Sequence, residues 1–344
     1  MHSFDRVDAL ADSPLSLSVI IVTYNSGRVV AGAIDSVRLL LPDAEIVVVD
    51  NGSSDATLEI VTARGAERVV RGHGNVGFGG GVNRGARLAK GTLLLVINPD
   101  AILTAVDRSE WHALSTRSVV GIRRCRFVGS GDGDRPLDRR WSPRAELSWA
   151  LLNWFLVPRE VSLRRPRLSR RAGPGWVHGA AFVVSRSEFL ALGGFDERLF
   201  LYFEDYELSR RYASHDLPVA TTDSATVAHT GQASSPREED LLTAYALLSL
   251  IQYADSWEGR PAAERVASSA LRGLAVVSLT GRLLRRVPWL GTRAARKALS
   301  ADSVRRILAA EIHPELPSHV YGEARRAVAA IESRFARTAA APKE

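Results

Sequence analysis

The stretch "LSVIIVT" at residues 17–23 decides the fold, together with "EIVVVD" at 45–50. Both runs are short, apolar and rich in β-branched residues, which is typical of strands buried on both faces of a parallel sheet. A segment of helical length separates them, so they predict a βαβ unit. Further strands are expected at 67–71 and 92–97, with a helix in the second half of the glycine-rich segment 72–91. The first hundred residues are therefore predicted to be a doubly wound α/β fold.

Polar residues follow three of these apolar runs. Thr23 and Asn25 lie at the end of the first run, Asp50 ends the second, and Asn98 and Asp100 follow the strand expected at 92–97. Ligands of such sheets bind beyond the carboxyl ends of the strands. We therefore expect these side chains to share one rim and to form a ligand site.

The rest of the chain divides into a loop, a further α/β stretch and a helical region. Residues 105–145 are charged and interrupted by "GSGDGDRP", which favours a surface loop. A strand is expected at 175–186, a helix at 204–214 and a strand at 218–228. From about 237 to 336, apolar positions recur at helical spacing, which predicts a C-terminal helical region.

Composition limits the class of protein. The 344 residues, 46% of them hydrophobic, can bury one large core or two smaller ones. The single cysteine, Cys125, excludes an internal disulfide and a multi-cysteine metal site, and it fits a reducing compartment. Residues 1–16 carry acids and do not resemble a signal peptide, and no apolar run reaches the roughly 18–20 residues of a membrane span. We therefore expect a cytoplasmic protein.

The net charge of +7 is concentrated beside apolar segments that carry tryptophan. Six arginines between positions 159 and 171 follow "LSWALLNWFLV" (147–157), and residues 271–300 hold seven Arg or Lys and no acid. This combination suits anionic lipid headgroups better than nucleic acid, for which no motif is present. A solvated helix face is the alternative. We expect peripheral association with the inner face of the plasma membrane and no nucleic-acid partner.

The glycine-rich segment "NVGFGGGVNRG" (75–85) differs from known nucleotide-binding loops. Val82 stands where a dinucleotide fingerprint needs its third glycine, and G-K-[ST] is absent, which argues against a dehydrogenase and a P-loop NTPase. What remains is a flexible loop that opens a helix whose N-terminus can receive a diphosphate.

Two acidic segments allow both a structural and a chemical interpretation. In "INPDA" (97–101), Asp100 is a suitable ligand for a divalent cation that bridges diphosphate oxygens, although Asn-Pro-Asp is also ordinary turn chemistry. In "LFLYFEDYELSRR" (199–211), Glu204 and Asp205 follow an aromatic run. They are either first-turn acids favoured by the helix dipole or a general base beside a sugar-binding wall.

Taken in order, seven segments resemble an inverting family 2 glycosyltransferase with the GT-A fold: "SVIIVTYNS", "EIVVVDNGSSD", "NVGFGGGVNRG", "LLLVINPDAIL", "WVHGAAFVVSR", "GGFDERLFLYFEDYELSRR" and "VAHTGQAS". They are most similar to the bacterial rhamnosyltransferases that build cell-wall and O-antigen polysaccharides. The resemblance implies a Rossmann-like, mostly parallel sheet flanked by helices, with a C-terminal helical extension. It implies these parts: a flexible N-terminus (1–15), a catalytic domain (16–235) with a nucleotide-sugar half (16–105) and an acceptor half (106–235), and the helical region (236–344).

The resemblance also implies roles for individual residues. The nucleotide-sugar contacts would be Thr23, Asn25, Asp50, Asn75, Gly77, Asn83 and Asn98, with Asp50 accepting from the N–H of the pyrimidine ring. Asp100 corresponds to the last acid of the family's D-x-D metal motif, in which Asn98 replaces the first acid, and His229 corresponds to a second metal ligand. Asp205 corresponds to the general base, and Glu204 would orient the acceptor or support the base. His178 is assigned no catalytic role.

The implied reaction moves a sugar, L-rhamnose from dTDP-rhamnose by preference, to a hydroxyl of a lipid-linked or polysaccharide acceptor with the help of Mg²⁺ or Mn²⁺. A non-catalytic membrane scaffold and a nucleotidyltransferase are the alternatives. The acids at 100 and 205 and the histidine at 229 argue against a scaffold, and "VTYNSG" lacks the basic glycine-rich signature of a nucleotidyltransferase. The sequence leaves the oligomeric state open.

Overall fold

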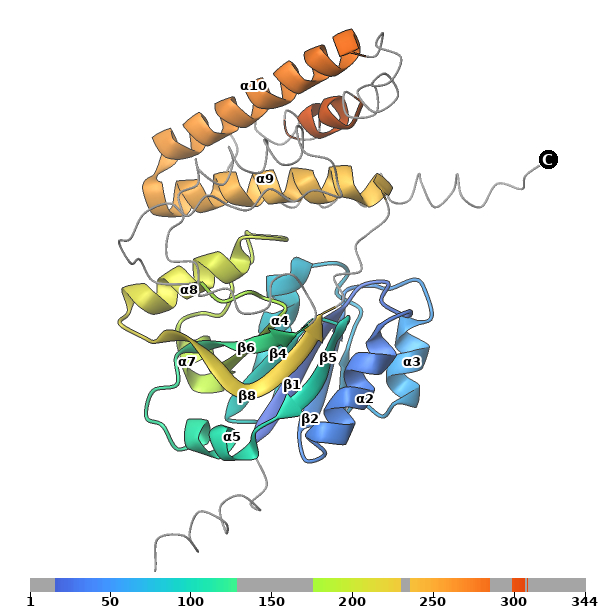
Figure 1. Cartoon of the computed structure of the whole chain (residues 1–344), viewed down its shortest axis with the longest axis vertical. Coiled ribbons are helices and arrows are strands. Elements are labelled where there is room, and N and C mark those ends of the chain that lie inside the picture. The colour runs from blue at the N-terminus through green and yellow to red at the C-terminus, as the bar shows by residue number, and fades with distance from the viewer. Residues whose placement is uncertain (1–15, 129–175, 230–235, 285–298, 307, 309–344) are drawn as a thin grey trace, which may run out of the picture. The chain divides into compact units, whose positions relative to one another are not determined.

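A computed structural model describes residues 16–128, 176–229, 236–284, 299–306 and 308. The described residues form two compact units (Figure 1): an α/β unit made of 16–128 and 176–229, and a helical unit that begins at residue 236. Several sequence predictions lie outside the described residues. These concern the N-terminus (1–15), the tryptophan-bearing run 147–157, the arginines of 159–171 and Trp289.

An eight-stranded mixed sheet is the centre of the α/β unit (Figure 1), with strand order β3-β2-β1-β4-β7-β6-β8-β5. Its strands are β1 (Leu17–Thr23), β2 (Glu45–Asp50), β3 (Arg68–Val70), β4 (Leu93–Ile97), β5 (Ala101–Val106), β6 (Ile122–Val128), β7 (Ala181–Ser185) and β8 (Val219–His229). The pairs β1–β2, β1–β4, β2–β3 and β6–β8 are parallel, whereas β4–β7, β6–β7 and β5–β8 are antiparallel. The predicted α/β class is confirmed.

Helices cover both faces of the sheet. They are α2 (Val30–Leu40), α3 (Thr57–Ala63), α4 (Gly77–Leu88), α5 (Arg108–Ser115), α7 (Arg186–Ala191) and α8 (Glu204–Ser214). Alternate residues of β1 explain this arrangement: Val19 and Ile21 pack into a core cluster shared with α2 and α5, and Ile20 and Val22 pack into a second cluster with α4, α7 and α8. Every residue of β1 is buried, as the unbroken apolar run predicts.

The strand registers place the predicted polar ends on one rim. Thr23 is aligned with Asp50 across β1 and β2, and Ile21 is aligned with Ile97 across β1 and β4, so Asn98 follows at the same edge. Because β7 runs antiparallel to β4, the residues that precede β7 lie at this edge too. Segments more than 80 residues apart in the sequence therefore meet there.

The prediction of a surface loop at 105–145 is wrong for the described residues of that range, 105–128. Helix α5 occupies Arg108–Ser115, and β6 occupies Ile122–Val128 in the interior of the sheet. The three arginines of "IRRCRFV" hide the strand pattern, yet Ile122, Arg123 and Cys125 are buried. The strand expected at 175–186 is shorter, Ala181–Ser185, whereas the helix at 204–214 and the strand near 218–228 are confirmed.

The helical unit begins with two long helices, α9 (Pro236–Glu258) and α10 (Arg260–Leu284), which pack together. Gly259, with a φ of +82°, makes the turn between them. Residues 299–306 are also helical. In the described part of the chain, none of the helices combines the length and the apolarity needed to cross a bilayer.

Candidate active site

The loops that follow β1 and β2 are tied together at the rim. The Thr23 hydroxyl donates to Asp50 Oδ1 over 3.0 Å, and the backbone N–H groups of Gly52 and Ser53 donate to Asp50 Oδ2 over 3.1 and 2.9 Å. Asp50 is only 1% exposed. The predicted nucleoside residue thus fixes the turn after β2, and its contact with a pyrimidine N–H stays a prediction.

Asn25 joins the same two loops on their outer side. It has a φ of +50°, and its side-chain Oδ1 accepts from the Ser54 N–H over 2.8 Å. Its own N–H donates to Ser53 Oγ over 2.9 Å, while the Gly27 N–H donates to Asp55 Oδ2 over 3.0 Å. Asn25 is exposed, so it can meet a ligand at this wall, as predicted for the nucleoside side.

The glycine-rich segment approaches the loop that precedes α8. Gly77, the first residue of α4, has a φ of +78°, and a Cβ added there would lie 2.1 Å from the Phe200 carbonyl oxygen. Asn75 Oδ1 accepts from the Gly77 N–H over 3.1 Å, and the Phe78 N–H donates to the Phe200 carbonyl over 3.2 Å. Only glycine fits where these two segments touch.

Asn83 fastens α4 to the segment before α8. Its Nδ2 donates to the Phe195 carbonyl over 2.9 Å and to Glu197 Oε1 over 3.1 Å, and its Oδ1 accepts from the Phe195 N–H over 2.8 Å. Both amide donors are used and the residue is 2% exposed. The structure therefore gives Asn83 a bracing role, and its contact with nucleotide or sugar stays a prediction.

The two predicted metal ligands lie side by side. Asp100 directly precedes β5, His229 ends β8, and the pairing of these strands brings Asp100 Oδ1 within 3.2 Å of His229 Nε2. Asn98 Nδ2 lies 3.5 Å from the same nitrogen. The side chains of Asp100 and His229 are partly exposed, at 16% and 19%. A carboxylate oxygen and an imidazole nitrogen that converge in this way can hold a divalent cation.

The protein alone does not complete a metal shell. Among the described residues, no three His, Cys, Asp or Glu side chains gather in a way that could hold an ion. Mg²⁺ is commonly bound by one or two carboxylates together with substrate phosphates. The pair of Asp100 and His229 fits that partial type of site.

Asp205 is presented by a strained turn at the start of α8. Tyr202 and Phe203, the two residues before the helix, have φ values of +67° and +65°, which are uncommon for bulky side chains. Such strain costs about 1–3 kcal/mol per residue and is found mainly at functional sites. The turn leaves Asp205 half-buried and buries Glu204.

Backbone contacts link Asp205 to the metal-ligand pair. The Gly179 N–H donates to Asp205 Oδ2 over 2.8 Å, and the next residue, Ala180, accepts from the Asn98 N–H over 2.9 Å. The short segment before β7 therefore spans the distance between the candidate base and the strand end that precedes Asp100. Gly179 was not predicted to matter, since its contact with Asp205 crosses 26 residues of sequence.

Burial and charge shift the pKa values of the acidic pair upward. Burial raises the pKa of Glu204 well above its usual range, and the neighbouring Asp205 raises it further. Burial also raises the pKa of Asp205, although His178 and the N–H groups of Gly179 and Tyr206 act in the opposite direction. Glu204 Oε2 has no hydrogen-bond partner among the described residues. An acid with a raised pKa beside an aromatic surface suits a general base.

Arg211 belongs to the scaffold of the α/β unit. Its Nη1 donates to the carbonyls of Leu192 and Gly194 over 2.7 Å each, and its Nε donates to Glu207 Oε1 over 3.1 Å. The guanidinium thereby holds the turn after α7 against α8, and a phosphate contact would compete with three protein acceptors.

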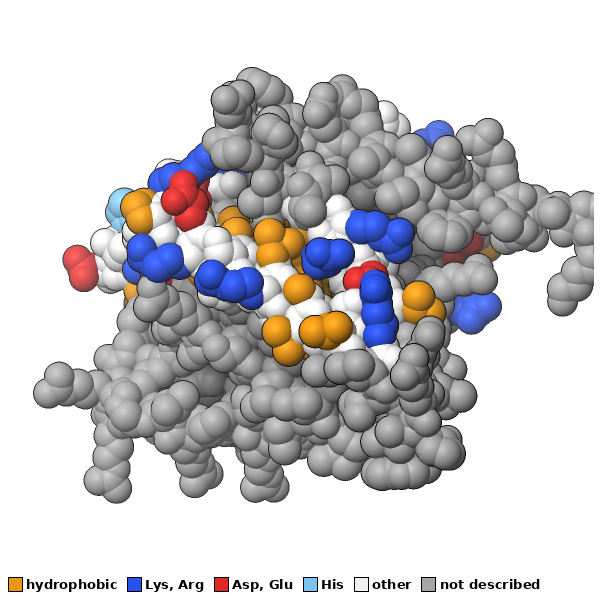
Figure 2. All heavy atoms as spheres, turned by 90° about the horizontal axis from the view of Figure 1, so that it is seen from above, with side chains coloured by type: hydrophobic (Ala, Val, Ile, Leu, Met, Phe, Trp, Pro, Cys, Tyr) orange, Lys and Arg blue, Asp and Glu red, His pale blue; other side chains and the backbone are white. Residues whose placement is uncertain are grey.

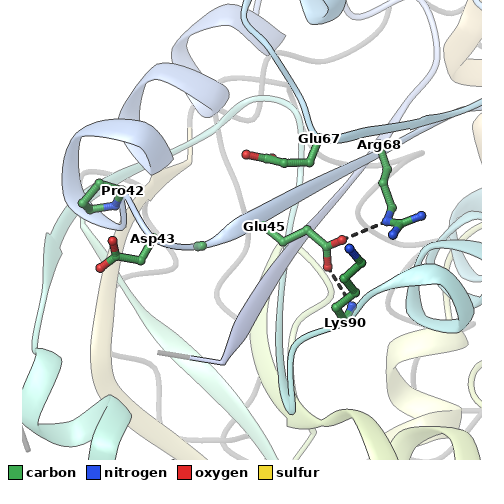
Figure 3. A pocket seen from close by; sticks show the side chains of 7 residues that line it. Pro42, Asp43, Glu45, Glu67, Arg68 and Lys90 are labelled. Carbon is green, nitrogen blue, oxygen red and sulfur yellow. Dashed lines mark hydrogen bonds and ion pairs between the residues drawn. The ribbon is translucent and has the colours of Figure 1, made fainter. Parts of the chain in front are cut away.

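A cavity of about 290 Å³ lies elsewhere on the α/β unit. Figure 3 shows its lining side chains around Glu45, with dashed contacts from Glu45 to Arg68 and Lys90. Glu45 begins β2, so the cavity lies at the amino end of this strand, opposite the rim that carries Asp50. It is not part of the candidate active site.

Parts of this chain resemble known proteins. Residues 18–163 match the model of the family described as glycosyl transferase family 2. The N-acetylglucosaminyl-diphospho-decaprenol L-rhamnosyltransferase of Mycobacterium tuberculosis (strain CDC 1551 / Oshkosh) is 28% identical over 248 residues, which are 64% of this chain and 78% of the relative. A PGL/p-HBAD biosynthesis glycosyltransferase of Mycobacterium bovis (strain BCG / Pasteur 1173P2) is 36% identical over 95 residues, 26% of this chain and 37% of the relative.

A solved structure supports the fold. GalNAc-T7 with UDP, GalNAc and Mn²⁺ is similar with a TM-score of 0.50 and 21% identity, over 72% of this chain and 48% of that one. This chain thus spans about half the length of that transferase. Residues 18–163 of this chain thus carry a domain that matches glycosyl transferase family 2, and the chain shares its fold with that solved transferase.

Proposed function

We propose that the protein is an inverting glycosyltransferase that moves L-rhamnose from dTDP-rhamnose to a hydroxyl of a lipid-linked glycan in bacterial cell-wall synthesis. The observation that carries the proposal is the single rim on which Asp205, Asp100 and His229 are joined through Gly179 and Ala180. The choice of rhamnose and of a polyprenyl diphosphate sugar as acceptor is supported by the mycobacterial L-rhamnosyltransferase that resembles this chain.

In this proposal Asp205 removes the proton of the acceptor hydroxyl as that oxygen attacks the anomeric carbon. The carboxylate is oriented by the Gly179 N–H, so its free lone pairs point along a fixed direction. Direct displacement inverts the anomeric centre because the nucleophile enters opposite the leaving nucleotide. Glu204, buried beside the base, would support it by its position.

The leaving group carries the other half of the chemistry. Asp100 and His229 would hold Mg²⁺ or Mn²⁺, which when bound neutralises charge on the departing diphosphate. On the donor side, Thr23, Asn25 and Asp50 would meet the nucleoside, while Asn75, Gly77, Asn83 and Asn98 would line the nucleotide and sugar or hold the loops that do.

A lipid-linked acceptor requires approach to a bilayer, and α10 carries a suitable surface. Val276 and Leu279 are 60% and 61% exposed, and Arg272 and Arg282 are exposed on the same helix. Figure 2 shows basic side chains beside apolar ones on the described part of this surface. Apolar residues flanked by arginines favour binding to anionic headgroups. We therefore place transfer at the inner face of the plasma membrane.

Calorimetric titration of the full chain with dTDP-rhamnose, UDP-galactose and GDP-mannose, with and without Mg²⁺ or Mn²⁺, tests the donor. We expect metal-dependent binding of dTDP-rhamnose, and tighter binding of another donor would reject rhamnose. Asp100→Ala should weaken binding only when metal is present. Asp205→Asn should bind the donor normally and fail to transfer, and normal turnover by this variant would reject the assignment of the base.

Flotation with vesicles tests the membrane surface. The full chain should float with vesicles that contain anionic lipid and remain unbound with neutral ones. A variant with Val276→Ser and Leu279→Ser should float less, and Leu39→Ser, which replaces an exposed leucine on α2, provides the control. Equal flotation of all three proteins would exclude α10 as the contact.

A further inference from the structure

Two aromatic rings lie on the segments that hold the candidate base and are outside both hydrophobic cores. Trp176 and Tyr206 are half-buried, and neither belongs to either core cluster of the described residues. Tyr206 follows Asp205 on α8, and Trp176 lies three residues before Gly179, whose N–H contacts the Asp205 carboxylate. Both rings therefore belong to the segments that hold this carboxyl group.

The rings form one end of a continuous aromatic cluster. The centroids of Trp176 and Tyr206 are 6.0 Å apart with planes inclined by 57°, and those of Trp176 and His178 are 5.9 Å apart. His178 lies 6.1 Å from Phe127 and 6.4 Å from His229. This cluster thus extends from the side of the candidate base to the candidate metal ligand.

Partly exposed aromatic rings beside a carboxylate suit a ligand with both apolar and hydroxyl-bearing parts. A pyranose ring has such a surface, because its C–H groups form an apolar face and its hydroxyls lie around the edge. An aromatic face carries negative charge density that attracts these C–H groups. Ligand sites typically combine such rings with a few polar groups that fix orientation. A hydroxyl of a sugar lying against Trp176 would be directed at Asp205.

We infer that Trp176 and Tyr206 form the stacking surface for the sugar ring of the acceptor. The inference rests on the proposed function in taking Asp205 as the base and a sugar as the acceptor, and it adds which residues hold the ring of that sugar.

Saturation-transfer NMR tests the inference without requiring turnover. The full chain, loaded with a nucleoside diphosphate and Mg²⁺, is titrated with methyl pyranosides of several hexoses and with glycerol. At least one pyranoside should receive more saturation than glycerol. Trp176→Leu should weaken its binding about tenfold, and Tyr206→Leu should weaken it by a similar factor. Trp176→Tyr, which keeps an aromatic face, should retain most of the affinity.

Trp257→Leu, a half-buried tryptophan of α9, serves as the matched control and should bind like the wild type. The inference is overturned if no pyranoside exceeds glycerol, or if neither leucine variant at the two proposed rings loses affinity. Should one variant fail to fold in circular dichroism, the other decides. Failure of the proposed function is seen separately, as absence of transfer from any nucleotide sugar while pyranoside binding persists.

Discussion

Replacing Gly77 by alanine tests whether the contact between α4 and the loop before α8 holds the site together. The new Cβ would lie 2.1 Å from the Phe200 carbonyl oxygen and 2.9 Å from its carbon, so backbone must move. Alanine also pays about 1–2 kcal/mol for the positive φ of +78°. Moving the loop would further break the hydrogen bond from the Phe78 N–H to Phe200.

Gly74 supplies a matched control for the contact. Its φ of +70° is similar, but a Cβ there meets nothing within 4 Å. Gly74→Ala should therefore lose only about 1–2 kcal/mol of unfolding free energy, the cost of the positive φ. Gly77→Ala should lose about 3 kcal/mol or more, because the clash and a lost hydrogen bond are added. At about 2–4 °C per kcal/mol, its Tm should fall by about 6–12 °C.

Urea and thermal unfolding of both variants measure these losses directly. Donor turnover, measured on the folded fraction, should fall in Gly77→Ala because the displaced loop carries the strained residues Tyr202 and Phe203 that precede the candidate base. It should be unchanged in Gly74→Ala. Equal stability of the two variants would show that the approach to Phe200 relaxes without cost and would refute the reasoning.

Three further predictions concern Glu204, Arg211 and Cys125 of the α/β unit. Because the folded-state pKa of Glu204 is raised above its usual 4.5, stability should fall as pH rises from about 4.5. Glu204→Gln should therefore raise the neutral-pH Tm by about 2–4 °C, for about 1 kcal/mol regained, and lose that advantage in acid; equal melting curves at both pH values would contradict this. Arg211→Lys should lose about 1–3 kcal/mol of unfolding free energy in urea, and an accompanying loss of donor binding in calorimetry would show that the guanidinium also contacts the donor. Burial raises the pKa of Cys125 to about 12, so its thiol should react with a disulfide reagent at pH 8 only after denaturation; rapid native labelling would contradict the buried position.

The strands that the sequence predicts best are those buried on both faces. "LSVIIVT" contains no charged side chain, and "EIVVVD" has charged side chains only at its two ends. The sequence pattern and the observed burial therefore agree. The strand β6 was not predicted, because its three arginines do not alternate regularly with its buried residues. One of them, Arg123, is itself buried, and its Nε donates to the Val120 carbonyl. A buried arginine satisfied by backbone cannot be read from composition.

The candidate site also contains positions that the sequence predicts and contacts that it does not predict. The positions of Thr23, Asp50 and Asn98 follow from one rule, that parallel strands end at a common edge, and the registers agree with it. The contact between Gly179 and Asp205 follows from no local pattern, because it requires β7 to run antiparallel beside β4. Such contacts depend on tertiary pairing, which a sequence motif does not encode.

The pairing of β7 with β4 also explains how the site can set the charge state of its base. Desolvation and Glu204 favour the neutral form of Asp205, whereas the Gly179 N–H and His178 favour the carboxylate. Two of the groups that favour the carboxylate, Gly179 and His178, come from the segment before β7, whereas the Tyr206 N–H and the opposing Glu204 belong to α8 itself. A shift of that segment relative to α8 would therefore change the basicity of Asp205, since each pKa unit corresponds to about 1.4 kcal/mol. The segment before β7 thus holds the base in place and lowers its pKa against the larger effect of burial.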